Sequence, residues 1–236
     1  MRKPEKRIIK KLISQGVLQD TSILCVCAGE AEKKLFEELN IKNVTLTNIN
    51  EDMESNKQDA MNLTYKNDSF DYVFVSNGLH HCSSPHRALL EMYRVARKTI
   101  IVFESKDSFL MRLAVKLNLT VEYECVDEIS KKGYGGRNNT CIPNYIYRWT
   151  KREFEKTIRS YYPIGKNKFK YYHELDIPEN LQKNKPLTWL IKLLLALLPG
   201  SKNVFCAIAT KPNSQEDIFP WIRNNFINYQ RILNSE

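Results

Sequence analysis

Two adjacent histidines, His80 and His81, are the residues of this 236-residue chain best suited to move a proton near neutral pH. An unperturbed imidazole titrates at about pH 6.5, so it can accept the proton of a hydroxyl group. Both follow residues 70–76, an apolar run that predicts a buried strand. We expect a reaction centre where that strand ends, with His81 favoured over His80 as the base. The alternative is that one ring packs under a ligand and the other caps the following turn.

Other polar or small residues follow predicted strands and could hold a ligand. Gly29 comes after the first apolar run, Asn48 ends the second, and Asp59 opens a segment read as a short strand or turn. Strands alternating with helices imply parallel pairing and right-handed crossovers. Because ligands bind at the carboxyl ends of such strands, we expect these positions to share one rim with residues 76–81.

The elements that must position these groups follow from hydrophobic periodicity. Ser84 and Pro85 mark the start of a helix, with Ser84 predicted as its N-cap. Strands are predicted at residues 22–27, 43–47, 70–76, 98–104, 168–175 and 203–210, and helices at 31–39, 84–96, 108–117, 187–198 and in a peripheral C-terminal segment, 213–236. Residues 1–20 predict a basic N-terminal helix, and residues 1–236 as a whole predict a single α/β domain.

Residues 23–31 resemble the first motif of class I S-adenosylmethionine (SAM) methyltransferases, a strand leading through a glycine-rich turn into a helix. The copy is incomplete: Cys25 stands where the family usually has an acid, and Cys27 and Ala31 stand where glycines are usual. Small residues matter there because the main chain approaches the cofactor closely.

Residues 44–53 resemble the second strand of that family and its following turn. An acid usually ends this strand and accepts both ribose hydroxyls, whereas here Asn48 holds the position. An amide can accept one hydrogen bond and donate another, but without charge assistance. Glu51 or Asp52 could substitute, and Asn48 could be a turn former only.

Residues 58–105 carry the strongest resemblance, to the methyltransferase type 11 group. In that group the residue matching Asp59 accepts a hydrogen bond from the adenine amino group, and the next backbone amide, here that of Ala60, reads the ring. A carboxylate suits such an exocyclic donor. More narrowly, residues 78–113 and 134–149 resemble methyltransferases of bacterial surface-polysaccharide clusters.

The resemblance implies a Rossmann-like fold, with a mostly parallel seven-stranded sheet, an antiparallel last strand, helices on both faces and a lid insertion. It implies SAM as cofactor. The cofactor-binding residues that it predicts are Cys27, Ala28, Gly29, Asn48, Asp59, Ala60 and Asn77. The incomplete motif leaves open a pseudoenzyme that acts as an interaction module.

Residues 120–165 are predicted to form the lid and to bind the acceptor. Aromatic rings stack on sugars, amides bind hydroxyls and arginines bind acidic groups. The predicted acceptor-binding residues are Tyr134, Arg137, Asn138, Asn139, Tyr145 and Arg148. We therefore expect a small-molecule or glycan acceptor, first a glycan or sugar-nucleotide hydroxyl, in polysaccharide biosynthesis. A lipid-like quinone would favour an apolar lid, and an ordered loop on the sheet edge is the structural alternative.

Composition and motifs also bear on nucleic-acid binding, metal binding and the redox compartment. The net charge of +9 could attract nucleic acid, but no nucleic-acid motif accompanies it, and a solvated helix face with Ile8, Ile9, Leu12 and Ile13 as its apolar side is favoured. The four histidines lack ligand spacing, so no metal site is predicted. The six cysteines form no dense framework, which favours the cytoplasm.

The longest apolar run, residues 187–199, is shorter than the roughly 20 residues that span a bilayer. No signal peptide is expected either. A buried helix is favoured for this run, and a helix lying on a membrane surface is the alternative. The oligomeric state stays open.

Overall fold

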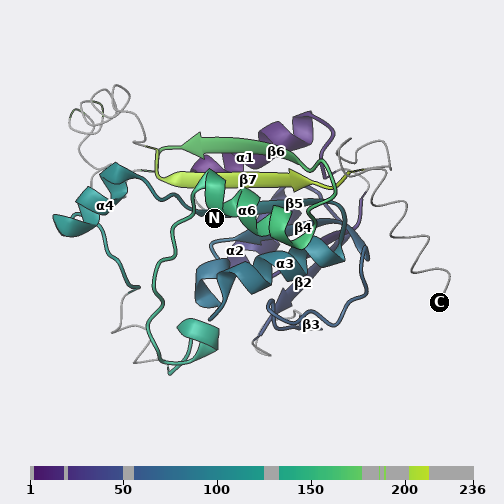
Figure 1. Ribbon diagram of the computed structural model, residues 1–236, viewed down its shortest axis with the longest axis horizontal. Helices are drawn as coiled ribbons and strands as arrows, with labels where there is room; N and C mark the ends of the chain where they lie inside the picture. The colour runs from purple at the N-terminus through teal and green to yellow at the C-terminus, as the bar shows by residue number, and fades with distance from the viewer. Residues whose placement is uncertain are drawn as a thin grey trace.

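A seven-stranded sheet forms the centre of the computed structural model, which describes residues 3–18, 21–49, 56–124, 133–176, 186, 189 and 202–212 (Figure 1). The strand order is β3-β2-β1-β4-β5-β7-β6. The strands are β1 (Ile23–Cys25), β2 (Val44–Asn48), β3 (Asn56–Lys57), β4 (Phe70–Ser76), β5 (Ala96–Ser105), β6 (Lys168–Glu174) and β7 (Val204–Thr210).

The pairing confirms the predicted mixed sheet. Strands β1 to β5 pair in parallel, so their carboxyl ends share one edge. Strand β7 is antiparallel to both β5 and β6, as the methyltransferase resemblance implies. The chain reverses between β3 and β4 from one side of β1 to the other, which creates the topological switch point where ligands bind in such folds.

Helices cover both faces of the sheet (Figure 1). They are α1 (Lys3–Ser14), α2 (Glu30–Glu38), α3 (Pro85–Val95), α4 (Phe109–Lys116) and α6 (Lys151–Tyr161), with short 3-10 turns η1 (Leu79–His81) and η2 (Arg137–Asn139). Alternate residues of β5 supply two cores: Val102 packs with α3 and α6, and Phe103 packs with α1 and α2. This period of two is what a strand buried on both faces requires.

Helix α1 confirms the predicted basic helix and its apolar side. Ile8, Ile9 and Leu12 are buried against the sheet, while Ile13 packs at the edge of the same core. Glu5 is also fully buried, although it lies in a strongly basic segment. A buried carboxylate needs a partner, and its partner lies at the functional rim.

One helix was missing from the predictions, and two local predictions can be compared in detail. Helix α6 was missed inside the predicted lid: Trp149, Phe154 and Ile158 are fully buried, so this part of residues 120–165 is core. Ser84 is the N-cap of α3, as predicted, although its side chain makes no capping hydrogen bond. Asp59 begins a turn, one of the two predicted alternatives, and the short strand β3 comes before it.

Some predictions lie outside the described residues: the helix at 187–198 apart from position 189, the segment 213–236, and the substitute acids Glu51 and Asp52. Within the described ranges, no helix has the length and apolar character needed to cross a bilayer.

Candidate active site

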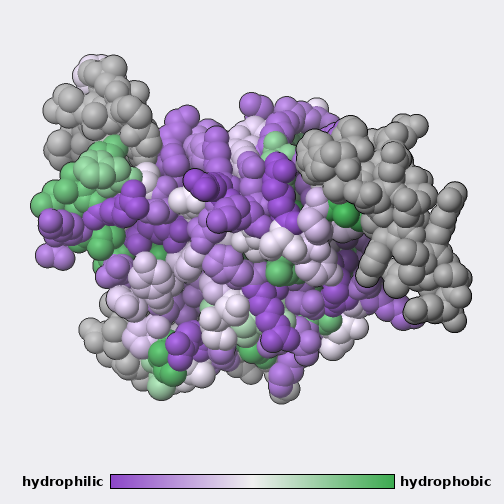
Figure 2. Space-filling model, viewed as in Figure 1, coloured by the Kyte–Doolittle hydropathy of each residue, from purple (hydrophilic) through white to green (hydrophobic). Residues whose placement is uncertain are grey.

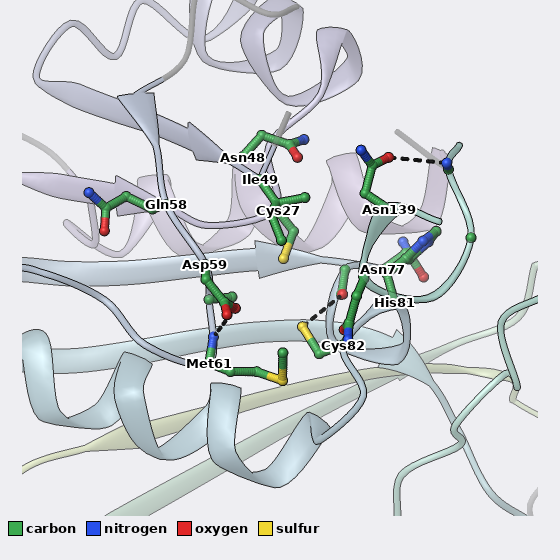
Figure 3. Close-up of a pocket in the computed structure, with 15 residues that line it drawn as sticks. Cys27, Asn48, Ile49, Gln58, Asp59, Met61, Asn77, His81, Cys82 and Asn139 are labelled. Carbon is green, nitrogen blue, oxygen red and sulfur yellow. Dashed lines mark hydrogen bonds between the residues drawn. The ribbon is translucent and has the colours of Figure 1, made fainter. Parts of the chain in front are cut away.

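A cavity of about 210 Å³ lies at the carboxyl ends of β1, β2 and β4 (Figure 3). Five of the seven predicted cofactor-binding residues line it: Cys27, Asn48, Asp59, Ala60 and Asn77. The other two support its wall. Ala28 is buried, and Gly29 is the N-cap of α2, where its amide donates to the Glu32 carboxylate at 3.0 Å.

Backbone conformation explains why glycine is usual at position 27. Cys27 has φ of 51°, in the left-handed region that favours glycine. A non-glycine residue there costs about 1–2 kcal/mol. Gly78 approaches from the opposite side, and a Cβ built on it would lie 2.5 Å from the Cys27 Cβ. The cavity wall therefore tolerates a side chain at position 27 only because position 78 has none.

Asp59 and Asn48 hold their loops through local hydrogen bonds. The Asp59 Oδ1 atom accepts from the Met61 amide at 2.8 Å, and the side chain lines the cavity (Figure 3). The Asn48 amide nitrogen donates to the Ala28 carbonyl at 2.6 Å, which ties the ends of β1 and β2 together. Asn48 thus has a structural function besides any ribose contact.

Asn77 depends on a residue that the sequence reasoning missed. Its φ is 51°, and its amide nitrogen donates to the Glu5 carboxylate at 2.8 Å. Glu5 comes from α1, 72 positions earlier, so no local spacing could reveal the pair. Together with Glu32, it puts carboxylates near the turn in which Cys25 replaces the usual motif acid.

The donor set fits a cationic nucleoside cofactor. Asp59 offers a carboxylate suited to an exocyclic amine, and buried acids behind the turn favour positive charge. The residues present therefore suit SAM, which carries a sulfonium and an adenine.

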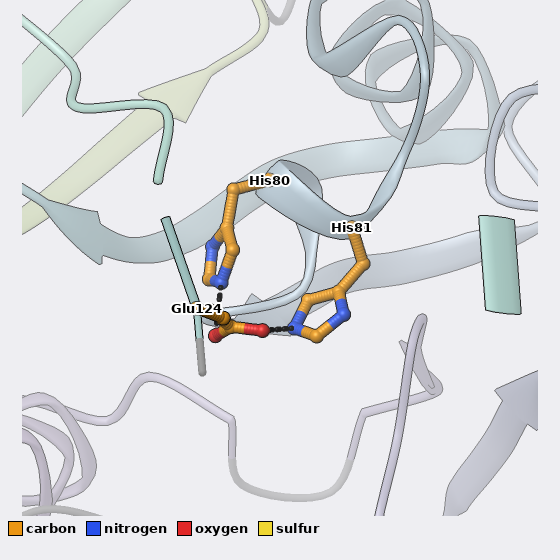
Figure 4. A group of neighbouring side chains, drawn as sticks. All are labelled: His80, His81 and Glu124. Carbon is orange, nitrogen blue, oxygen red and sulfur yellow. Dashed lines mark hydrogen bonds and ion pairs between the residues drawn. The ribbon is translucent and has the colours of Figure 1, made fainter. Parts of the chain in front are cut away.

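His80 is held by two carboxylates at the sheet edge. Its Nδ1 lies 2.9 Å from the fully buried Glu104, and its Nε2 lies 3.2 Å from Glu124 (Figure 4). Burial alone would lower the pKa of His80, but the two carboxylates outweigh it and raise the pKa to about 10. His80 is therefore a buried cation at neutral pH, and both ring nitrogens are engaged. This geometry does not favour it as a base.

His81 has the opposite electrostatic environment and lines the cavity. Its Nδ1 lies 2.8 Å from the Asn144 amide nitrogen, and its Nε2 lies 3.7 Å from Glu124 (Figure 4). Burial, followed by the positive charge of His80, lowers its pKa. A neutral His81 accepts from Asn144 at Nδ1 and carries its own proton on Nε2, toward Glu124.

The structure also forms a cluster that sequence spacing hid. The ligand atoms of His80, His81 and Glu124 lie within 4.8 Å of one another, a spacing that could hold a metal ion. Glu124 follows His80 by 44 positions, which is why no ligand motif is visible. Because each imidazole nitrogen already faces a hydrogen-bonding or charged partner, we interpret the cluster as a proton-holding network.

The described part of the structure has a second cavity, of about 440 Å³. Its lining is charged and aromatic: Asp107, Arg112, Val115, Glu122, Tyr145, Tyr147, Arg148 and Glu153. Two of its lining residues, Glu122 and Tyr145, lie close in sequence to Glu124 and Asn144, the partners of His81. The Glu124 amide donates to the Asn144 carbonyl at 3.0 Å, which joins the two segments.

The predicted acceptor-binding residues divide between the cavities. Tyr145 and Arg148 line the second, whereas Asn138 and Asn139 line the first. The Asn138 side-chain oxygen accepts from the Ser83 amide at 2.8 Å, which fastens the lid beside His81. Two further predicted residues, Tyr134 and Arg137, are exposed and line neither cavity.

Comparison with known proteins identifies the domain. Residues 21–103 match the family model described as methyltransferase domain. No curated protein matches the sequence.

Solved structures share the fold at low sequence identity. A SAM-dependent methyltransferase from Archaeoglobus fulgidus has a TM-score of 0.54 and 14% identity, over 89% of this chain and 95% of that chain. A SAM-dependent methyltransferase from Thermotoga maritima has a TM-score of 0.51 and 19% identity, over 89% and 88%. Residues 21–103 thus carry a methyltransferase domain, and most of the chain has the fold of class I SAM-dependent methyltransferases.

Proposed function

We propose that this enzyme methylates a hydroxyl group of a small polar acceptor, a glycan or sugar nucleotide, in polysaccharide biosynthesis. The single observation that carries the proposal is the position of His81, which lines the cofactor cavity while its partners Glu124 and Asn144 belong to segments that also line the second cavity. The described cysteines are free thiols, which suits a cytoplasmic enzyme.

The lining of the second cavity suits a sugar. Tyr145 and Tyr147 offer ring faces, and Arg148 and Glu122 offer charged hydrogen-bonding groups. A lipid-like quinone would need a predominantly apolar lining. An arginine in the same cavity suits an acidic substituent or a phosphate of the acceptor.

In the proposed step, His81 is the general base. The acceptor hydroxyl replaces the Asn144 amide at Nδ1 and gives up its proton there as its oxygen bonds to the methyl carbon. Glu124 then stabilises the resulting imidazolium through Nε2, as the carboxylate does in a catalytic triad. SAM, when bound, supplies an activated methyl group on a sulfonium that leaves as a neutral thioether. His81 is neutral at neutral pH because burial and His80 lower its pKa, so it is ready to accept the proton.

Methyl transfer to a panel of sugar nucleotides and glycans, with His81→Gln beside the wild type, tests this proposal. We expect kcat to fall by about 10²–10⁴-fold while SAM affinity is unchanged, the usual contribution of a positioned base. His173→Gln is the matched control, because His173 lies on β6 and lines neither cavity. Equal activity of His81→Gln and wild type on a hydroxyl acceptor would contradict the proposed base.

A further inference from the structure

Helix α4 presents its apolar stripe to solvent. Phe109, Leu113 and Leu117 follow one another at a spacing of four, so they share one helical face. Their exposed fractions are 71%, 38% and 57%, and α4 has no buried residue. A helix of a globular protein normally turns such a stripe to the core, so this exposure calls for a partner outside the described chain.

The segment after α4 extends the exposed apolar surface. Leu119, Val121 and Tyr123 alternate along it and are 74%, 59% and 52% exposed. Arg148 fixes the segment by donating to the Val121 carbonyl at 2.7 Å. Figure 2 shows these apolar side chains in green at the end of the molecule where α4 lies, beside a strongly hydrophilic surface.

Several cations lie on or near this apolar surface. Arg112 and Lys116 are exposed on α4 itself, which contains no acid, while Asp107 pairs with Arg112 at 3.6 Å and Glu122 is the one acid of residues 119–123. At the same edge of the sheet, burial lowers the pKa of Lys106, and the neighbouring charges of Lys151 and Lys202 lower it further. Cations that repel one another around an apolar face are complementary to a surface that is both apolar and anionic.

We propose that α4 and residues 119–123 dock this enzyme on an anionic lipid surface. The apolar stripe enters the headgroup boundary, and the surrounding lysines and Arg112 contact anionic headgroups, the arrangement of a helix that lies in a membrane interface. A second copy of the chain is the less favoured occupant, because lysine is depleted in the centres of protein–protein interfaces.

Docking at this edge would turn the catalytic rim toward the lipid. Strand β5 ends next to Lys106, and Arg112 and Val115 of α4 line the second cavity. Figure 1 shows α4 beside the end of the sheet at which β7 begins. An acceptor carried on a lipid would thus arrive at the cavity next to His81, although the docking itself does not depend on which acceptor is used.

Co-sedimentation with vesicles tests the proposal. The full chain is mixed with phosphatidylglycerol–phosphatidylcholine vesicles or with pure phosphatidylcholine vesicles. We expect binding to the anionic vesicles that is at least tenfold stronger and falls with added salt. The triple variant Phe109→Ser, Leu117→Ser, Leu119→Ser should lose at least tenfold of that binding, and Lys116→Glu with Lys202→Glu should lose it for anionic vesicles.

Tyr161→Ser is the matched control, because Tyr161 is an exposed aromatic residue on α6, outside the α4 surface. Thermal unfolding and SAM binding show that each variant is folded. Equal binding of the triple variant and wild type, or no preference for anionic vesicles, would overturn the proposal. So would a dimer in light scattering that the triple variant abolishes without any vesicle binding, because a second copy would then be the occupant.

Discussion

The walls of the two cavities at the rim of this sheet differ: backbone turns form one, and long side chains form the other. The cofactor cavity is shaped by main-chain turns, with Cys27 and Asn77 in the left-handed region and Gly78 packed against them. The second cavity is shaped by long side chains such as Arg112, Arg148 and Glu122. A wall made of backbone can keep its form when side chains change, so an incomplete glycine motif can still give a cavity of this form. A wall made of side chains changes its specificity with each substitution.

The network between the two cavities should give the largest effect on stability. Glu104→Gln removes the fully buried carboxylate that holds His80, and breaking such a pair typically costs about 3–5 kcal/mol. Urea denaturation should show this loss in the free energy of unfolding. Glu124→Gln is the control and should lose less, since Glu124 is one-third exposed. A loss below about 1 kcal/mol for Glu104→Gln would show that the pair is not the anchor of the rim.

The same network predicts a pH dependence. The pKa of His80 is raised from 6.5 to about 10, so its stabilising effect is fully present below pH 6.5 and is lost as the pH rises toward 10. The free energy of unfolding should therefore decline across that window, and His80→Gln should flatten the decline. Denaturation curves at several pH values measure this. If the free energy of unfolding of His80→Gln declines as steeply as that of the wild type, a group other than His80 causes the pH dependence.

Substitutions at Gly78 and Cys27 test whether the backbone shapes the cofactor cavity. Gly78→Ala places a Cβ against that of Cys27, so we expect about 1–3 kcal/mol of destabilisation and weaker SAM binding. Cys27→Gly removes the colliding atom and relieves a left-handed residue. The double variant should recover SAM affinity relative to Gly78→Ala alone, as a titration of each protein would show. Independent, additive effects would mean that the two positions do not collide.

The smallest effect is expected from metal removal. We interpret His80, His81 and Glu124 as a proton-holding network, so a chelator should leave both thermal stability and methyl transfer unchanged. A clear loss of thermal stability or of methyl transfer that a divalent cation restores would show that these residues bind a metal ion.

Sequence pattern predicted the cofactor half well because its elements have strong periods. Strand β4 lies where the apolar run at 70–76 placed it, and Asp59 lines the cavity as the family resemblance implied. Helix α6 was missed although its two buried residues, Phe154 and Ile158, have the spacing of four that an amphipathic helix requires; few apolar residues otherwise mark the segment. The seven-stranded order followed from the resemblance more than from any local pattern.

The long-range partners of Asn77 and of the histidines could not be predicted, for a physical reason. Glu5, Glu124 and Asn144 act through contacts between segments 44 to 72 positions apart, and only the fold brings them together. The one sign in the sequence was that Glu5 is the only acid among the basic residues 1–11, and its burial in the structure explains why it needs a partner.

Isothermal titration of the chain with SAM tests the central claim most directly. Asp59→Asn is the informative variant, since its side-chain oxygen can still accept from the Met61 amide while the second carboxylate oxygen is lost. We predict saturable binding by the wild type and roughly a 10- to 150-fold loss in Asp59→Asn, the effect of losing one charged hydrogen bond. Asp68→Asn, on an exposed residue outside the cavity, should bind like the wild type. Absence of binding by the wild type, or equal affinity in Asp59→Asn, would contradict the assignment of this cavity to the cofactor.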